Sequence, residues 1–328
     1  MRREPERGKT AILAEAEGIS GRLGTARRGR QSWTEWLAPC VGTTLGDVHV
    51  IAASCSAYQQ IEIGESAQFG RIFRLDGRVM STEADAWIQH ELMVHPMAAA
   101  HGSPRSALVV GGGDGGSAFE LLRIPTIREV VVAELDAEVV RLAREWLPGI
   151  HQGALSAPGK PDDPRLHIAI GDAHGLMEAF GRAGRRFDLI VFDLTEADDG
   201  SPATALFSLH GLQAARRCLA PGGAMSIHLG PPLHRPDTTR LLLARLRELF
   251  AHVAPLATFI PAYGALWGIA LASDALDIAA CPASQIATRL RQWQLTSALR
   301  CYHADLHPAL FTHPRHLQAI FDSAGGSK

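Results

Sequence analysis

The chain has 328 residues, of which 46% are hydrophobic and 20% charged, a composition sufficient for one large globular domain or two smaller ones. A formal net charge of −2 and an isoelectric point near 6.7 exclude a general electrostatic affinity for nucleic acid or for an anionic membrane surface. The five cysteines are scattered and include no Cys-x-x-Cys pair, which argues against a disulfide framework. The sequence contains no run of eighteen apolar residues, so it predicts no membrane-spanning helix. We therefore expect a cytoplasmic protein whose partner is a small molecule.

The first 45 residues are predicted to be a flexible basic N-terminal tail. Arginines are frequent there and a secretory apolar core is missing, while the interspersed glutamates argue against a transit peptide. Residues 46–100 are predicted to form an N-terminal β module plus a connecting helix. The module contains the alternating segments "QQIEI" and "RIFRL" between glycine-containing turns, and the helix is "EADAWIQHELMVHPMAAA".

Residues 101–328 show a regular alternation of strand-like and helical segments, which predicts a Rossmann-like catalytic domain. The strand-like segments are "ALVVG", "EVVVAEL", "RLHIAIG", "FDLIVFD" and "AMSIHL". Near the end, only "PAYGA" separates "HVAPLATFI" from "LWGIALAS", so these two should pair antiparallel. The predicted fold class is α/β, a class I methyltransferase-like Rossmann fold. Its mostly parallel sheet carries a C-terminal antiparallel hairpin and is preceded by a small antiparallel β domain.

The stretch "SALVVGGGDGGSAFELL" is a strand, a glycine turn and a helix start, the beginning of a nucleotide-binding unit. The turn contains an acid, Asp114, where a dinucleotide would place its phosphates. A carboxylate about 4 Å from a phosphate charge costs on the order of 4 kcal/mol at an effective dielectric constant of ~20, and it attracts a cation by a similar amount. The ligand is therefore expected to carry positive charge there, as a sulfonium nucleoside of the S-adenosylmethionine type does.

Acidic residues follow the other strand-like segments too, and the carboxyl ends of parallel strands are where ligands bind in such sheets. Taken singly, each acid has the alternative role of a helix cap. Together they favour a binding site, and Glu134 lies twenty residues beyond Asp114, the spacing of a ribose-binding acid. The acids are Asp114, Glu134, Asp136, Asp172, Asp193, Glu196, Asp198 and Asp199.

Other conspicuous residues receive a plainer interpretation. His90 and His95 in "HELMVH" are five residues apart, about 140° around a helix, so they do not share a face and no metal site is predicted. Trp87 and Trp267 are assigned to the core rather than to a ligand platform.

The sequence resembles the polyamine aminopropyltransferase family, whose best-known member is spermidine synthase, from about Tyr58 almost to the C-terminus. The matching stretches occur in family order, among them "SAYQQIEI", "LVVGGGDGGSAFELLR", "VVAELDAEVVRLAREWLP", "DDPRLHIAIGDA", "FDLIVFDLTE", "IPAYGALWGIALASD" and "CYHADLHPALF". The resemblance implies transfer of an aminopropyl group from decarboxylated S-adenosylmethionine, a co-substrate, to an amine, usually putrescine. The products are spermidine and 5′-methylthioadenosine, no cofactor is held permanently, and relatives imply a homodimer or homotetramer.

The resemblance also implies roles for individual residues. Asp193 corresponds to the catalytic aspartate. The predicted substrate-binding residues are Gln89, His90, Asp114, Glu196 and Tyr263. The predicted residues for the co-substrate are Gln59, Gly111, Gly113, Glu134, Asp172, Ala173 and Pro202. A primary amine with a pKa of ~10.4 is protonated at pH 7, and removing the proton costs about 4.6 kcal/mol. Because the protonated nitrogen cannot attack, a carboxylate that accepts the proton suits the reaction. The resemblance requires no metal.

This chain departs from the family pattern mostly at the acceptor end. Its loop "DLTEADDGSPA" has Glu196 in place of an aspartate and is two residues longer. Gln89 stands where most members have tyrosine, and His228 and His303 replace a glutamine and an asparagine. Spermidine, agmatine or another diamine therefore remain alternative acceptors. An S-adenosylmethionine-dependent polyamine N-methyltransferase is a further alternative, which the retention of Asp114 disfavours, and a non-catalytic polyamine sensor is the third.

Overall fold

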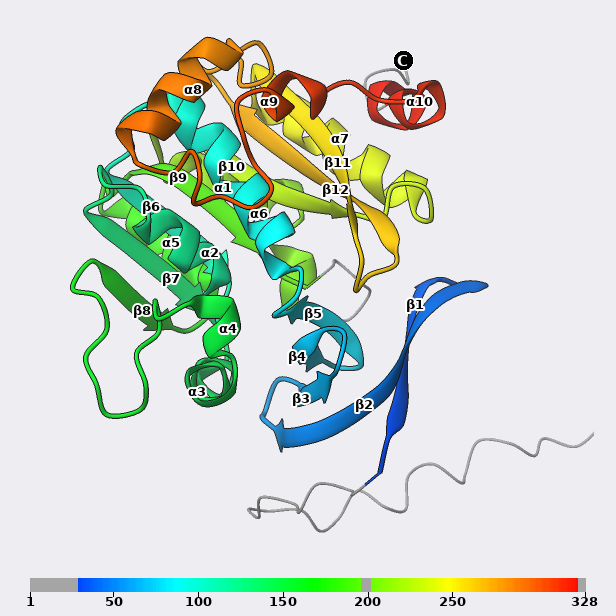
Figure 1. Cartoon of the computed structure of the whole chain (residues 1–328). Coiled ribbons are helices and arrows are strands. Elements are labelled where there is room, and N and C mark those ends of the chain that lie inside the picture. The colour runs from blue at the N-terminus through cyan, green and yellow to red at the C-terminus, as the bar shows by residue number, and fades with distance from the viewer. Residues whose placement is uncertain (1–28, 196–201, 324–328) are drawn as a thin grey trace, which may run out of the picture.

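The computed structural model describes residues 29–195 and 202–323, which contain two β-sheets (Figure 1). The smaller sheet is antiparallel, with the strands in sequence order from β1 to β5. Its strands are β1 (Gln31–Ala38), β2 (Val41–Cys55), β3 (Gln60–Ser66), β4 (Gly70–Leu75) and β5 (Arg78–Thr82). The predicted small antiparallel β domain is confirmed.

The predicted extent of the N-terminal tail is wrong for residues 31–45, which form β1 and the first part of β2. The reason is burial. Trp33 is only 3% exposed and packs beneath the Arg74 guanidinium, 4.7 Å from the ring centroid. Gly64 on β3 makes room for it, since a Cβ there would lie 2.5 Å from the Trp33 ring. Residues 1–28 lie outside the described part of the chain.

The predicted connecting helix is α1 (Ala86–His101), and it belongs to the larger domain by its contacts. Leu92, Met93 and Met97 are fully buried in the same core cluster as Val109 of the glycine-motif strand. A division at residue 100 would therefore separate this helix from the sheet on which it packs.

The larger sheet has seven strands in the order β11–β12–β10–β9–β6–β7–β8. The five strands from β6 to β10 are parallel, while β12 is antiparallel to β10 and β11 is antiparallel to β12, as the hairpin prediction requires. The strands are β6 (Ser106–Gly111), β7 (Glu129–Glu134), β8 (Leu166–Ile170), β9 (Phe187–Asp193), β10 (Leu219–Gly230), β11 (His252–Ile260) and β12 (Ala265–Ser273). This arrangement confirms the predicted fold class.

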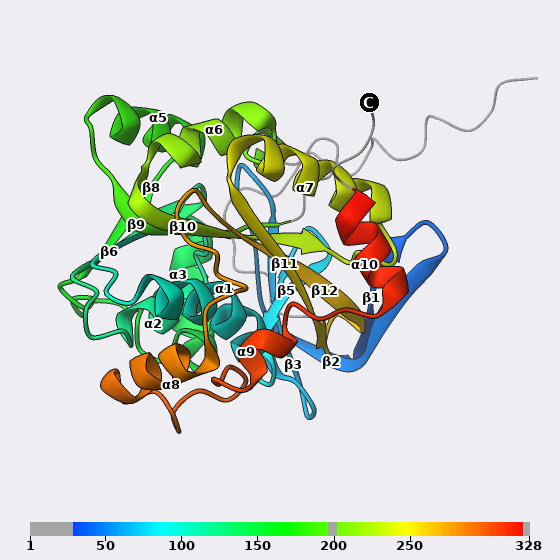
Figure 2. The same cartoon turned by 90° about the horizontal axis from the view of Figure 1, so that it is seen from above.

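Both faces of the larger sheet are covered, which explains why its strands read as continuous apolar runs. Along β6, Ala107 and Val109 enter one core cluster, and Leu108 and Val110 enter the other. Figure 2 shows α1, α2 and α8 on one side of the sheet and α5, α6 and α7 on the other. The further helices are α2 (Gly116–Leu122), α3 (Ala137–Trp146), α4 (Pro148–His151), α5 (Ala173–Arg182), α6 (Leu209–Arg217), α7 (Pro236–Leu249), α8 (Ala283–Gln292), α9 (Leu306–Ala309) and α10 (Arg315–Asp322). None of the helices in the described ranges has the length and apolarity needed to cross a bilayer.

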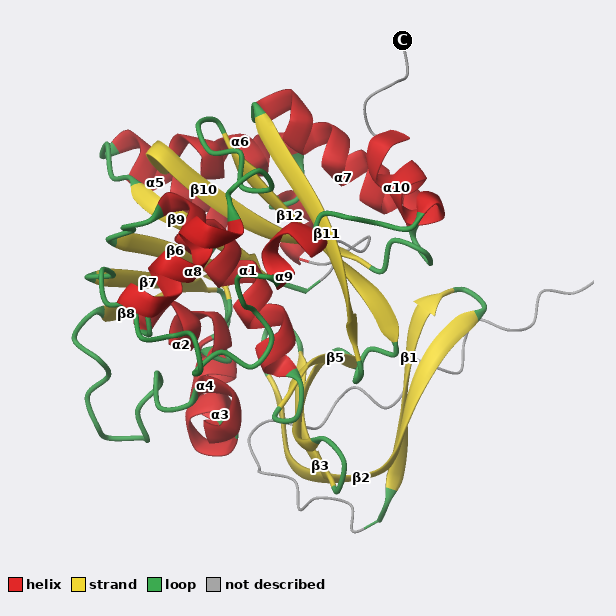
Figure 3. Cartoon of the chain, turned by 45° about the horizontal axis from the view of Figure 1, so that its top comes forward, coloured by secondary structure: helices red, strands yellow, loops and turns green. Residues whose placement is uncertain are grey.

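The two sheets share a third core cluster, which fixes the small domain on the large one. Trp33, Leu45 and Val79 of the small sheet are buried with Tyr263 and Trp267 of the β11–β12 hairpin. Figure 3 shows the long β1–β2 ribbon turning back toward the end of that hairpin. The shared core places β5 against the carboxyl ends of β6 and β9.

Candidate active site

A cavity of about 430 Å³ lies at the carboxyl ends of β6, β7 and β9, beneath the small sheet. Of the residues predicted from the sequence, those lining it are Gln59, Gly111, Gly113, Asp114, Glu134, Asp172, Ala173 and Asp193. No lysine or arginine lines it among the described residues. The carboxylates in this lining lie among glycines and apolar side chains, with no described lysine or arginine beside them.

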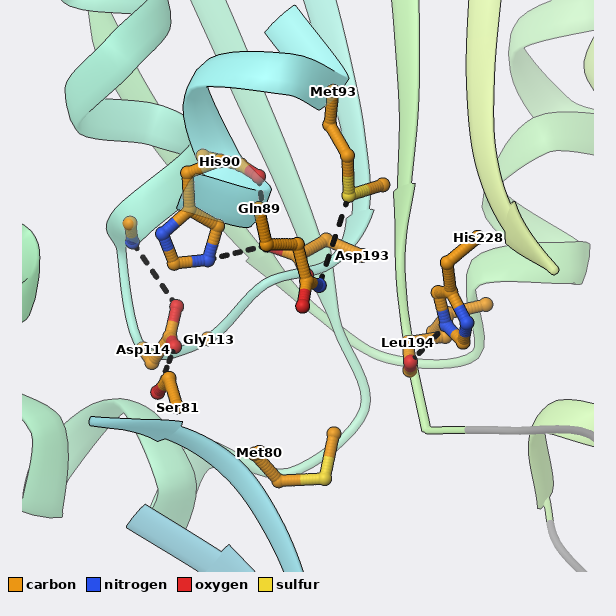
Figure 4. A network of polar contacts seen from close by, with 12 residues as sticks. Met80, Ser81, Gln89, His90, Met93, Gly113, Asp114, Asp193, Leu194 and His228 are labelled. Atoms are coloured by element: carbon orange, nitrogen blue, oxygen red, sulfur yellow. Dashed lines mark hydrogen bonds and ion pairs between the residues drawn. The ribbon is translucent and has the colours of Figure 1, made fainter. Parts of the chain in front are cut away.

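The glycine turn is held against the end of β9, which brings two acids together. The Gly112 N–H donates to the Asp193 carbonyl at 2.8 Å. Gly111 has φ +77°, and a Cβ there would lie 2.3 Å from the Asp193 carbonyl oxygen, so only glycine fits this approach. As a result Asp114 and Asp193 face the same region (Figure 4).

Asp114 is buried and anchored at both carboxylate oxygens. The Ser81 hydroxyl on β5 donates to Oδ2 at 2.7 Å, and the Gly116 N–H donates to Oδ1 at 3.0 Å. Ser81 was not predicted as a site residue, because its relation to Asp114 arises only from the packing of the two domains. These two hydrogen bonds fix the direction of the carboxylate.

Asp193, at the end of β9, is the second acid. Ser117 donates its hydroxyl hydrogen to Oδ2 at 2.7 Å, and Nε2 of His90 lies 3.6 Å from the same oxygen. Burial raises the pKa of Asp193, an effect that Asp114 increases and that His90 and Ser117 oppose. A carboxyl whose pKa is raised binds a proton more readily, as a general base requires.

His90 and His95 both lie against α2, but they have different partners. His90 contacts Asp193, whereas His95 Nε2 lies 2.7 Å from Glu120 Oε2 in the buried core. His90, Asp114 and Asp193 each place one potential metal ligand within 4.8 Å of the others, so the expectation of a metal-free site stays a prediction.

Residues from distant segments line a small pocket that shares Met80 and Leu194 with the cavity. The Tyr263 hydroxyl lies 2.9 Å from Oε1 of Gln89 and also contacts the Met80 carbonyl. Burial, with nearby carboxylates such as Asp85, raises the pKa of Tyr263, which keeps the hydroxyl neutral. His228 contacts the Leu194 carbonyl and stacks on Trp267, which is buried as predicted.

The opposite end of the cavity is built around Glu134. Its carboxylate accepts the Gly113 N–H at 3.0 Å and the Asp136 N–H at 2.9 Å. Burial is the main reason that the pKa of Glu134 rises to about 7. Gln59 also lies here, since its Nε2 donates to Asp136 Oδ2 at 3.1 Å.

Some predicted residues have a structural role or stand apart from the cavity. Asp136 and Asp172 are N-caps of α3 and α5, the alternative that the sequence left open, although Asp172 also lines the cavity. Pro202 is the first residue of a 3₁₀ turn (Pro202–Ala205). Glu196, Asp198 and Asp199 lie outside the described residues, and His303 is exposed.

The contact between His90 and α2 gives a first testable prediction. A Cβ at Gly116 would lie 2.0 Å from the His90 ring, which is itself buried, so Gly116→Ala should displace His90 from Asp193. We expect the free energy of unfolding to fall by about 1–3 kcal/mol, the usual cost of overpacking, as measured by denaturant titration. Gly181→Ala is the matched control, because its nearest neighbour atom is 3.8 Å away. Equal stability of the two variants would contradict the close packing of His90.

The sequence was compared with family models and with curated proteins, and both comparisons give the same family. Residues 86–280 match the model described as "Spermine/spermidine synthase domain", and residues 52–83 match "Spermidine synthase tetramerisation domain". The chain is 42% identical to a polyamine aminopropyltransferase of Nitrosomonas europaea, over 87% of this chain and 84% of that one. It is 36% identical to polyamine aminopropyltransferase 1 of Pseudomonas aeruginosa, over 80% and 88% of the two chains.

Solved structures give the same result. The crystal structure of a spermidine synthase in complex with the transition-state analogue AdoDATO superposes with a TM-score of 0.80 at 25% sequence identity. The superposition covers 93% of this chain and 98% of that one. Spermidine synthase from Thermotoga maritima superposes with a TM-score of 0.78, at the same identity and coverage.

Proposed function

The chain belongs to the spermine/spermidine synthase family of polyamine aminopropyltransferases, and we propose that it transfers the aminopropyl group of decarboxylated S-adenosylmethionine to putrescine. The products are spermidine and 5′-methylthioadenosine. The observation that supports this most is a pair of carboxylates, Asp114, which is buried, and Asp193, whose side chain is 12% exposed, in a cavity lined by no described lysine or arginine. Such a cavity suits a sulfonium that faces an amine. The attraction between one carboxylate and one cation about 4 Å away is on the order of 4 kcal/mol at an effective dielectric constant of ~20.

The proposed reaction is a direct displacement. Asp193 accepts a proton from the attacking ammonium, and the freed nitrogen lone pair bonds to the aminopropyl carbon attached to sulfur. The carbon–sulfur bond breaks, and its electron pair neutralises the sulfonium to leave a thioether. Asp114 holds positive charge at the amine-binding end, and the fixed carboxylates align the two reactants.

The acceptor is the finer part of this proposal. Gln89, His90 and Tyr263 are proposed to contact it, supported by the contact of His90 with Asp193 and by the hydrogen bond of Tyr263 to Gln89 in the small pocket next to Leu194. Glu196 keeps its proposed acceptor role from the family pattern. Gln59, Gly111, Gly113, Glu134, Asp172, Ala173 and Pro202 are proposed to contact the nucleoside, with no resident cofactor. We propose the cytoplasm as the compartment and a homodimer or homotetramer as the assembly, supported by the tetramerisation-domain match.

The test of the proposed function is to incubate the enzyme with putrescine and, separately, decarboxylated or intact S-adenosylmethionine. Mass spectrometry should find spermidine and 5′-methylthioadenosine with the decarboxylated donor only. Methylputrescine formed from the intact donor, with no product from the decarboxylated one, would identify an N-methyltransferase instead. A panel with spermidine and agmatine as acceptors, compared by kcat/KM, then decides the acceptor.

Glu134 gives a pH-dependent prediction. With a pKa of about 7 this carboxyl is half protonated at pH 7, and ribose hydroxyls that donate to it would favour its charged form. Binding of 5′-methylthioadenosine should therefore release about half a proton at pH 7 and almost none near pH 9, where the free carboxyl is already ionised. Calorimetry in buffers of different ionisation enthalpy measures this release, and Glu134→Gln should abolish it. A binding enthalpy independent of buffer at pH 7 would rule out Glu134 as the ribose contact.

A further inference from the structure

A second cluster of ligating side chains lies away from Asp193, on the other face of the sheet. His174 and Glu178 are four residues apart on α5 and so share one face of that helix, and His210 is in the first turn of α6. The two helices lie side by side in Figure 2, and the rings of His174 and His210 have centroids 4.9 Å apart. One potential ligand atom from each of the three residues lies within 4.8 Å of the other two.

The chemistry of this cluster is that of a transition-metal site. Two imidazoles and a carboxylate are a common protein ligand set for zinc, with ligand bonds of about 2.0–2.2 Å and a fourth position left for water. Ligand atoms in such a site are about 3.3–3.5 Å apart, so small side-chain rotations would close the present spacing. In addition, Nε2 of His174 is buried and has no hydrogen-bond partner among the described residues.

Two arginines lie near Glu178, and they leave one of its carboxylate oxygens available to bind a metal ion. Arg217 contacts Oε1 of Glu178. Among the described residues, the ion pair of Oε2 is with Arg182, at 3.7 Å, and the Arg182 side chain is 72% exposed. An exposed pair at this distance is weak, so a divalent ion can replace Arg182 at Oε2 while Arg217 keeps its contact.

We propose that His174, Glu178 and His210 bind one divalent transition-metal ion, such as Zn²⁺, which joins α5 to α6. Nitrogen ligands select Zn²⁺, Ni²⁺ or Cu²⁺ over Mg²⁺ and Ca²⁺. The chain runs directly from Asp172 and Ala173, in the cavity wall, into His174, and from Leu206, in the same wall, to His210. The ion therefore ties together two segments of the wall without occupying the cavity.

Titration of ZnCl₂ into the metal-stripped, untagged full-length chain, followed by calorimetry, tests the proposal. We expect one ion per chain, and affinity at least about tenfold weaker in His210→Ala and in Glu178→Gln. His316→Ala is the matched control, since His316 is also exposed in the first turn of a helix, and it should bind as the unaltered chain does. MgCl₂ should give no binding heat.

Zn²⁺ should also raise the melting temperature of the unaltered chain and of His316→Ala but not that of His210→Ala. This second readout depends on the folded protein and not on turnover, so its result is independent of the proposed function. The absence of zinc binding, or zinc binding of equal strength in His210→Ala, would overturn the proposal.

Discussion

Replacing Asp193 by asparagine should lower kcat by about 10³-fold, within the range that a positioned general base contributes. The amide cannot accept the proton of the attacking ammonium, while its oxygen can still accept the Ser117 hydroxyl hydrogen. Binding of 5′-methylthioadenosine should be kept, because Glu134 and Gln59 lie at the other end of the cavity. Steady-state kinetics and calorimetry on the same preparation measure the two effects.

The control for this prediction is Asp237→Asn, which removes a carboxylate of 95% side-chain exposure on α7 and should leave kcat unchanged. Thermal unfolding of both variants shows whether each is folded. Unchanged turnover in Asp193→Asn would remove Asp193 from the role of base. Loss of nucleoside binding together with turnover would instead make it a binding residue.

Asp114→Asn should reduce the preference for the decarboxylated donor over intact S-adenosylmethionine. The intact donor carries a carboxylate, and holding it about 4 Å from Asp114 costs on the order of 4 kcal/mol at an effective dielectric constant of ~20. At about 1.36 kcal/mol per tenfold change, removing this repulsion should lessen the discrimination by roughly 10²- to 10³-fold. The asparagine can keep the present contacts, accepting from Gly116 and donating to Ser81.

The same substitution should lower kcat/KM for the normal reaction by about 10²-fold, because the positive charge at the amine-binding end loses its partner. Both kcat/KM and binding should be measured for the two donors in Asp114→Asn and in Ser81→Ala. Ser81→Ala removes only a hydrogen bond that positions Asp114, so the comparison distinguishes the effect of the Asp114 charge from the effect of its position. A preference that is unchanged in Asp114→Asn would mean that another group excludes the intact donor.

The larger sheet and its two central acids could be predicted from the sequence. The strands of a sheet buried on both faces are short apolar runs between helical segments, and such runs are visible without a structure. Asp114 and Asp193 follow two of these runs, and β6 and β9 are neighbours in the sheet, so their carboxyl ends meet. The order of strands in the sheet therefore brings these two acids, which are far apart in the sequence, close together in space.

Other parts of the site depend on tertiary packing that no local pattern records. Ser81 contacts Asp114 only because the shared core docks β5 on the larger sheet. Gln89 and Tyr263 are 174 residues apart, and their hydrogen bond depends on the packing of α1 against the β11–β12 hairpin. The sequence does not predict strand β1, because the arginine-rich residues before it obscure its short apolar pattern, whereas in the structure Trp33 is buried by β3 and Arg74.

The carboxylates of this cavity are expected to accept a cationic nucleoside and an amine rather than phosphates. Calorimetry with 5′-methylthioadenosine, putrescine and spermidine, set against NAD and ATP, measures this directly. We predict binding of 5′-methylthioadenosine and of the polyamines, and no binding of NAD or ATP. Tight binding of NAD or ATP, with none of 5′-methylthioadenosine or polyamine, would contradict the claim.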